Sequence, residues 1–141
     1  MAKNGTFHLG GNRMTRKVVN CDKVPPAIGS YSQGVWAGNL LFLTGVCGAD
    51  AGSGEILGHG DIRVETKAAM ETAKAMLASE GLTFDNVVNA RIYITSFDDF
   101  KKIDEVYRSY FTAPYPARAT VETAKLADGA HVEIVFVAYK E

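Results

Sequence analysis

Residues 132–139 have the sequence Val-Glu-Ile-Val-Phe-Val-Ala-Tyr. Successive side chains of a strand point to opposite faces of a sheet. Here both alternating sets are apolar apart from Glu133. A strand that is apolar on both faces is typical of the centre of a sheet, where both sides are covered. We therefore predict that this segment is a central strand.

Glu133 is the exception in this strand. A carboxylate among Val, Ile and Phe side chains is costly unless it is paired or protonated. One explanation is structural: the carboxylate is the partner of a buried arginine or of backbone N–H groups. The other is functional: the carboxylate serves as a general acid or base.

A second strand is predicted at residues 115–123, Tyr-Pro-Ala-Arg-Ala-Thr-Val-Glu-Thr. Pro116 lacks an N–H group, so it suits the first position of a strand rather than the middle. Beyond it, Arg118, Thr120 and Glu122 share one face. A guanidinium beside a hydroxyl is suited to binding a planar carboxylate. The alternative is a surface arginine that pairs with an Asp or Glu of the chain.

Asp128-Gly129 indicates a turn between these two strands. A tight turn there would make the strands a hairpin, with Arg118 opposite Tyr139 and Glu133 opposite Ala124. Arg118 and Glu133 would then be about six positions apart, roughly 20 Å at the rise of a strand. If both residues serve one site, we expect them to come from different subunits.

The rest of the chain alternates between strand and helix patterns. Further strands are predicted at residues 16–21, 31–36, 40–46 and 86–95. One helix begins after Asp61 and ends at Gly81, and its mostly apolar stripe from Ile62 to Leu77 is expected to face the core. A second helix begins after Ser96 or Asp98 and ends before Pro114. The order β-β-β-α-β-α-β-β predicts an α+β fold with two helices on one face of a mostly antiparallel sheet. The other face would carry uncovered apolar residues, so we expect self-association.

The composition narrows the class of protein. The chain has 141 residues and a formal net charge of -1, which favours neither nucleic acid nor an anionic membrane as a partner. We expect a loose N-terminal extension, residues 1–14, and a single domain, residues 15–141. No apolar run is long enough for a bilayer, and Cys21 and Cys47 form no Cys-x-x-Cys pair. These features favour reduced thiols and a cytoplasmic location, with organellar targeting by the extension as the alternative.

Three familiar kinds of catalytic site are not indicated. His8, His59 and His131 have no metal-binding spacing, so we expect no metal. His131-Val132-Glu133 has the spacing of a zinc deaminase motif, but the Pro-Cys-x-x-Cys half is missing. The Gly-x-Ser-x-Gly motif of serine hydrolases is also missing.

Four segments match one known family in order and spacing. They are residues 28–35 (IGSYSQGV), 38–45 (GNLLFLTG), 116–118 (PAR) and 132–134 (VEI). Through them, about residues 15–140 resemble the YjgF/Rid family, also called RidA-like, endoribonuclease L-PSP or RutC-like. The resemblance implies a chorismate-mutase-like α+β fold, a homotrimer with clefts between its subunits, and no cofactor. The implied activity is hydrolytic deamination of 2-enamine or 2-imine acids, such as 2-aminoacrylate and 2-iminobutanoate, to 2-keto acids and ammonia.

The same resemblance implies roles for five residues. Arg118 would bind the substrate carboxylate, and Glu133 would help to activate water. Tyr31, Thr44 and Thr120 would line the cleft.

Some positions depart from the family pattern, namely Ser30, Val46, Thr72 and Asp104. Two other functions stay open at this point. One is an endoribonuclease or translation inhibitor of the L-PSP type, which the near-neutral charge and the scattered histidines disfavour. The other is a non-enzymatic trimer that binds small acids, which would keep Arg118 but would not need Glu133.

Overall fold

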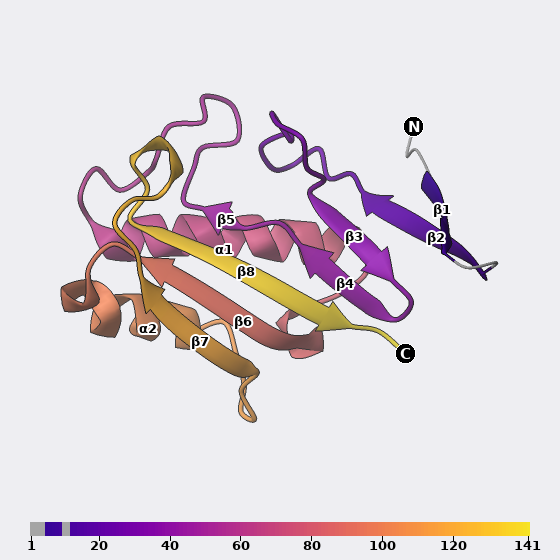
Figure 1. The fold of residues 1–141 in the computed structure, drawn as a ribbon. Coiled ribbons are helices and arrows are strands. Elements are labelled where there is room, and N and C mark those ends of the chain that lie inside the picture. Colours follow the sequence, from indigo (N-terminus) through magenta and orange to yellow (C-terminus); the bar gives the residue numbers. More distant parts are fainter. Residues whose placement is uncertain (1–4, 10–11) are drawn as a thin grey trace.

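The computed structural model describes residues 5–9 and 12–141 (Figure 1). Two helices, α1 (Ile62–Ser79) and α2 (Phe100–Arg108), lie on the same side of a sheet (Figure 1). The strands are β1 (Gly5–Leu9), β2 (Asn12–Val19), β3 (Gly34–Ala37), β4 (Leu40–Leu43), β5 (Val46–Cys47), β6 (Val87–Ile94), β7 (Ala117–Glu122) and β8 (Val132–Tyr139). Short 3-10 turns occur at Phe84–Asn86, Phe97–Asp99 and Ala127–Gly129. The predicted α+β class is confirmed.

β8 is a central strand, as its sequence predicts. The sheet order is β1-β2-β3-β4-β8-β6-β7, and β5 also pairs with β8. Every pairing is antiparallel except that of β6 with β7. The alternate side chains of β8 that face the helices are buried, namely Val132, Ile134, Phe136 and Ala138. The Phe136 ring lies among Phe84, Tyr107 and Phe111, and these rings form the centre of the core.

The first helix forms where its apolar period predicts. The carboxylate of Asp61 accepts a hydrogen bond from the Arg63 N–H, which caps the helix start. Gly81 has a φ of 72°, a left-handed conformation that ends helices and favours glycine. Between these ends, the predicted stripe is buried throughout: Ile62, Thr66, Ala69, Met70, Ala73, Met76 and Leu77.

The opposite face of the sheet carries exposed apolar side chains. Phe42 of β4 is 46% exposed, Val121 of β7 is 49% exposed and Tyr139 of β8 is 41% exposed. Neither helix covers this face, because α1 and α2 both lie on the other side (Figure 1). The uncovered apolar surface that the sequence predicts is therefore present.

The predicted hairpin between the Arg118 strand and the last strand is wrong. β7 pairs with β6 in parallel, and β8 pairs with the other edge of β6. The chain leaves β6, forms α2 and returns as β7, which is the crossover that parallel pairing requires. Asp128 and Gly129 do form a turn, with φ values of 55° and 74°, but it belongs to a longer connection.

The N-terminal part contains two paired strands. β1 and β2 pair antiparallel, and β2 also pairs with β3 at the edge of the main sheet (Figure 1). β2 therefore crosses the predicted boundary between residues 14 and 15, and the division into extension and domain stays a prediction. Within the described residues, no helix is long and apolar enough to cross a membrane.

Candidate active site

Three of the five predicted site residues line one cavity. Tyr31, Thr44 and Glu133 border a cavity of about 570 Å³, which we call the Glu133 cleft. Its walls come from the loop before β3, the β4–β5 connection, the loop that follows β5, one side of α1 and the turn before β8. The remaining lining residues are Val24, Pro25, Pro26, Ile28, Gln33, Gly45, Val46, Cys47, Ala49, Ala51, Gly52, Ser53, Gly54, Thr72, Met76, Ala127 and Asp128.

Glu133 is held against the connection between β4 and β5. It is paired with Cys47 of β5 and with Tyr93 of β6. The space for its carboxylate exists because Gly45 has no side chain. A Cβ on Gly45 would collide with Glu133 Oε1 and would lie 2.9 Å from Cδ. Gly45, two residues after the end of β4, therefore leaves the space that the Glu133 carboxylate occupies.

Cys47 is beside Glu133 but is not a reactive thiol. Burial, and then the negative charges of Glu133, Glu65 and Asp128, raise the pKa of Cys47 to about 12. At neutral pH the side chain is therefore a protonated thiol, whereas a nucleophilic cysteine needs its thiolate form. Both Cys21 and Cys47 are free.

The loop above the cleft is fixed by a buried amide. Gln33 Oε1 accepts a hydrogen bond from the Cys21 N–H at 2.7 Å, and Gln33 Nε2 donates to the carbonyls of Cys21 and Pro25. The backbone carbonyl of Gln33 accepts from the Thr44 N–H at 2.9 Å. Gln33 thus holds the two segments that carry Tyr31 and Thr44.

Arg118 lines a different cavity, of about 400 Å³, which we call the Arg118 pocket. Its lining residues are Asp104, Tyr107, Arg108, Tyr115, Pro116 and Arg118. Arg118 Nη1 donates to Asp104 Oδ1 at 2.6 Å. The guanidinium carbon lies 4.9 Å from the ring centroid of Tyr107 and 5.6 Å from that of Phe100. The alternative reading of Arg118, an arginine paired with an acid of the chain, therefore describes part of its environment.

Arg118 and Glu133 lie on opposite faces of the sheet. Arg118 is directly opposite the buried Ala90, so it points to the helix side. Glu133 is opposite Tyr93, in the row that alternates away from the helices. One protomer therefore does not bring these two side chains together. Thr120 lies opposite Ile92, on the same side as Arg118, and is not among the residues that line either cavity.

Glu65, a buried carboxylate of α1, was not among the residues predicted from the sequence. Glu65 is 1% exposed. Its Oε1 accepts hydrogen bonds from the N–H groups of His131, at 2.6 Å, and Val132, and its Oε2 lies 2.9 Å from His131 Nδ1. These contacts fix the start of β8 next to Glu133. A signal was present, because Glu65 falls within the apolar stripe of the helix, where an acid needs partners.

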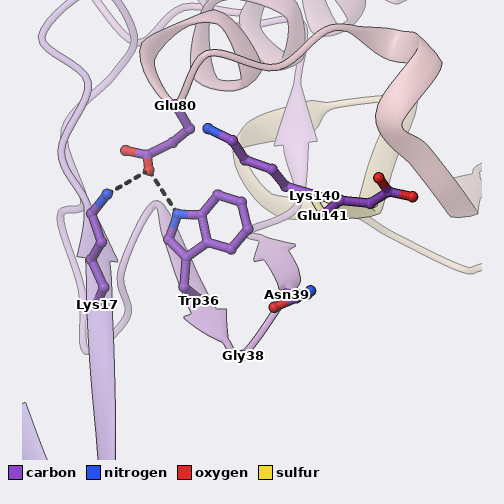
Figure 2. Close-up of a pocket in the computed structure, with 7 residues that line it drawn as sticks. All are labelled: Lys17, Trp36, Gly38, Asn39, Glu80, Lys140 and Glu141. Atoms are coloured by element: carbon purple, nitrogen blue, oxygen red, sulfur yellow. Dashed lines mark hydrogen bonds and ion pairs between the residues drawn. The ribbon is translucent and has the colours of Figure 1, made fainter.

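A further cavity, of about 410 Å³, lies at the β2–β3 edge and is shown in Figure 2. Glu80, the residue that follows the last residue of α1, accepts from Trp36 Nε1 at 2.7 Å and from Lys17 Nζ at 3.2 Å (Figure 2). These bonds tie the sheet edge to the helix end, so the cluster has a structural role. Among the described residues, no group of three or more His, Cys, Asp or Glu side chains could hold a metal ion.

Comparison with known families gives one match over most of the chain. The model of the family described as endoribonuclease L-PSP matches residues 21–140. The protein DfrA of Myxococcus xanthus is 43% identical over 128 residues, which cover 89% of this chain and 97% of that protein. The human protein named 2-iminobutanoate/2-iminopropanoate deaminase is 34% identical over 125 residues, which cover 89% of this chain and 90% of that protein.

Solved structures have the same fold. A crystal structure named as a putative endoribonuclease of Thermotoga maritima has a TM-score of 0.83 and 40% identity, covering 88% of this chain and 97% of that chain. A crystal structure of E. coli TdcF with bound serine has a TM-score of 0.83 and 31% identity, covering 89% of this chain and 99% of that chain.

Proposed function

Because the chain belongs to the endoribonuclease L-PSP family, also called the YjgF/Rid family, we propose that it hydrolyses reactive 2-imine and 2-enamine acids to 2-keto acids and ammonia. Relatives named as 2-iminobutanoate/2-iminopropanoate deaminases support this reaction. The observation that carries the proposal is the position of Glu133. Its carboxylate borders a cavity together with Tyr31 and Thr44, and Gly45 leaves room for it there.

The proposed chemistry needs positioning and one proton-transferring group. Arg118 binds the substrate carboxylate through two parallel N–H donors. Glu133 removes a proton from a water molecule as the water oxygen bonds to the electrophilic imine carbon, and the C=N π electrons move to nitrogen. Protonation of that nitrogen and rupture of the C–N bond then release ammonia. Loss of the hydroxyl proton leaves the keto acid, so one water is consumed for each ammonia formed.

The proposal requires a site shared between subunits. Arg118 and Glu133 point to opposite faces of the sheet in one protomer, so the pair must come from two protomers. We propose a homotrimer in which the apolar face with Phe42, Val121 and Tyr139 is buried. Light scattering at micromolar concentration should give three times the monomer mass. A stable monomer that nevertheless releases ammonia at full rate would exclude the shared site.

Glu133→Gln tests the proposed reaction. The amide keeps the shape of the side chain but cannot take the proton, so ammonia release from freshly generated 2-iminobutanoate should fall by about 10²- to 10⁴-fold. Binding of 2-oxobutanoate should change much less, because Arg118 makes the carboxylate contact. Glu55→Gln is a matched control, since Glu55 is exposed and does not line the Glu133 cleft.

Three outcomes, one for Glu133→Gln and two for the unaltered protein, separate the deaminase from the other functions. Unchanged turnover with a lower melting temperature would make Glu133 a structural partner and would remove it from the mechanism. A protein that binds 2-oxobutanoate but releases no ammonia would be a small-acid-binding protein. Cleavage of RNA without ammonia release would favour the endoribonuclease function instead.

A further inference from the structure

We propose that Asp104 recognises the positively charged nitrogen of the substrate, so that the Arg118 pocket selects zwitterionic acids over keto acids. This inference rests on the proposed function, because it assigns Arg118 to the substrate carboxylate. It adds a second contact, made by a carboxylate, to the nitrogen on the neighbouring carbon. The ligand class is a 2-iminium or 2-ammonium acid.

The first step is the arrangement of the guanidinium. Among the described residues, its one hydrogen bond is that from Nη1 to Asp104 Oδ1, at 2.6 Å. A guanidinium has five N–H donors, so Nε and Nη2 keep donors for a bound carboxylate. The rings of Tyr107 and Phe100, at 4.9 and 5.6 Å, restrict the movement of the guanidinium. Arg118 is therefore positioned before any ligand arrives.

The second step is the charge beside it. Asp104 lines the same pocket, and its side chain is 32% exposed, against 25% for Arg118. Oδ1 accepts from Arg118, which leaves Oδ2 as an acceptor. The pocket thus presents a cation and an anion side by side. A protonated imine acid carries the complementary pair, a carboxylate on one carbon and =NH2⁺ on the next. A keto acid has a carbonyl oxygen in place of the nitrogen, and Asp104 would repel it.

The third step is a polar atom without a partner. Tyr107 is 3% exposed, lines the Arg118 pocket, and its hydroxyl has no hydrogen-bond partner among the described residues. Buried polar groups are rarely left in this state. Burial is the main cause that raises the pKa of Tyr107 to about 12, so the group stays a donor at neutral pH. A ligand carboxylate on Arg118 supplies the missing acceptor.

Two stable ligands test the inference without turnover. 2-Aminobutanoate carries the charged nitrogen and 2-oxobutanoate lacks it. We expect calorimetry to show that the unaltered protein binds 2-aminobutanoate more tightly. In Asp104→Asn, 2-aminobutanoate should bind about 10- to 100-fold more weakly, the cost of losing a charge-assisted hydrogen bond. The affinity for 2-oxobutanoate should stay the same or rise, because a repulsive charge is removed.

The control is Glu105→Gln on the same helix. This variant also removes one negative charge, at the residue that follows Asp104 in the sequence. Glu105, however, pairs with Arg63 and does not line the Arg118 pocket. Both affinities should stay unchanged in this variant. Circular dichroism checks that Asp104→Asn is folded. If it is not, Asp104→Ser, which also lacks the carboxylate, provides the same comparison.

Three outcomes would overturn the inference. If Asp104→Asn weakened the binding of both ligands equally, Asp104 would only orient Arg118. If it strengthened the binding of both equally, Asp104 would only compete with ligand carboxylates for Arg118. No change in either affinity would exclude any contact. The proposed reaction is tested by a different measurement. If the protein released no ammonia, a preference for 2-aminobutanoate that depends on Asp104 would still show that this pocket recognises the charged nitrogen.

Discussion

Gly45→Ala should slow deamination by about 10²-fold without altering a polar group. The added Cβ would collide with Glu133 Oε1 and would lie 2.9 Å from Cδ and 3.1 Å from Cγ. Gly45 is not among the glycines with a positive φ, so the backbone itself accepts alanine. The whole effect of the substitution therefore falls on the position of the Glu133 carboxylate.

The size of the effect follows from these contacts. Non-bonded carbon atoms are normally about 3.5–4.0 Å apart, so the carboxylate must move by roughly 1 Å. A displacement of about 1 Å in a catalytic group costs on the order of 10²-fold in rate, which is about 2.7 kcal/mol in the barrier. Overpacking should also lower the free energy of unfolding by about 1–3 kcal/mol.

Ammonia release and the melting temperature are measured together on four variants: Gly45→Ala, Gly52→Ala, Glu133→Gln and the Gly45→Ala/Glu133→Gln double variant. Gly52→Ala is the matched control, because Gly52 also lines the Glu133 cleft but a Cβ there would meet only Asp50 Oδ1, at 3.4 Å. It should retain its rate. In the Glu133→Gln background, Gly45→Ala should lower the rate of ammonia release only slightly further. Full turnover in Gly45→Ala, or a further loss of about 10²-fold on top of Glu133→Gln, would show that the added Cβ does not act through the Glu133 carboxylate.

Three further predictions concern other residues. Arg118→Ala should abolish turnover in a folded protein, and Arg118→Lys should restore little of it, because an ammonium cannot bind a carboxylate through two parallel N–H groups. A variant that is largely unfolded, but keeps full activity per folded molecule, would contradict this. Glu65→Ala should lower the free energy of unfolding, measured with denaturant, by about 2 kcal/mol or more, because the N–H groups of His131 and Val132 lose their acceptor. A decrease of less than about 0.5 kcal/mol would show that water replaces the carboxylate as acceptor. Because the pKa of Cys47 is raised to about 12, iodoacetamide should label this thiol slowly at pH 8 and faster as the pH rises toward that value. Mass spectrometry measures the extent of labelling. Rapid labelling at pH 7 would mean that the thiol is exposed and ionised.

The sequence predicts best where a local pattern is also the structural cause. The stripe from Ile62 to Leu77 is buried because the helical period places it on one face, and β8 is central because both its faces are apolar. The strand that contains Arg118 was also predicted, with Arg118 and Thr120 on one side. In each case, neighbouring residues alone determine the result.

Pairing partners were harder to predict, because they depend on distant parts of the chain. The turn at Asp128-Gly129 is real, but whether β7 joins β6 or β8 is decided by the path through α2. That choice also decides that Arg118 and Glu133 face opposite sides. Likewise, a helix sequence shows that Asp104 is acidic, but only the packing of α2 against β7 places it next to Arg118.

The hydrogen bond between Trp36 and Glu80 makes the folding of this protein easy to observe. Trp36 is the one tryptophan of the chain, so its fluorescence comes from a single place, the junction of β3 with the end of α1. It is not among the residues that line the Glu133 cleft or the Arg118 pocket. An intrinsic emission change should therefore report separation of the sheet edge from the helix and should be insensitive to ligand occupancy. Variants of either cavity can thus be compared for stability without an added dye.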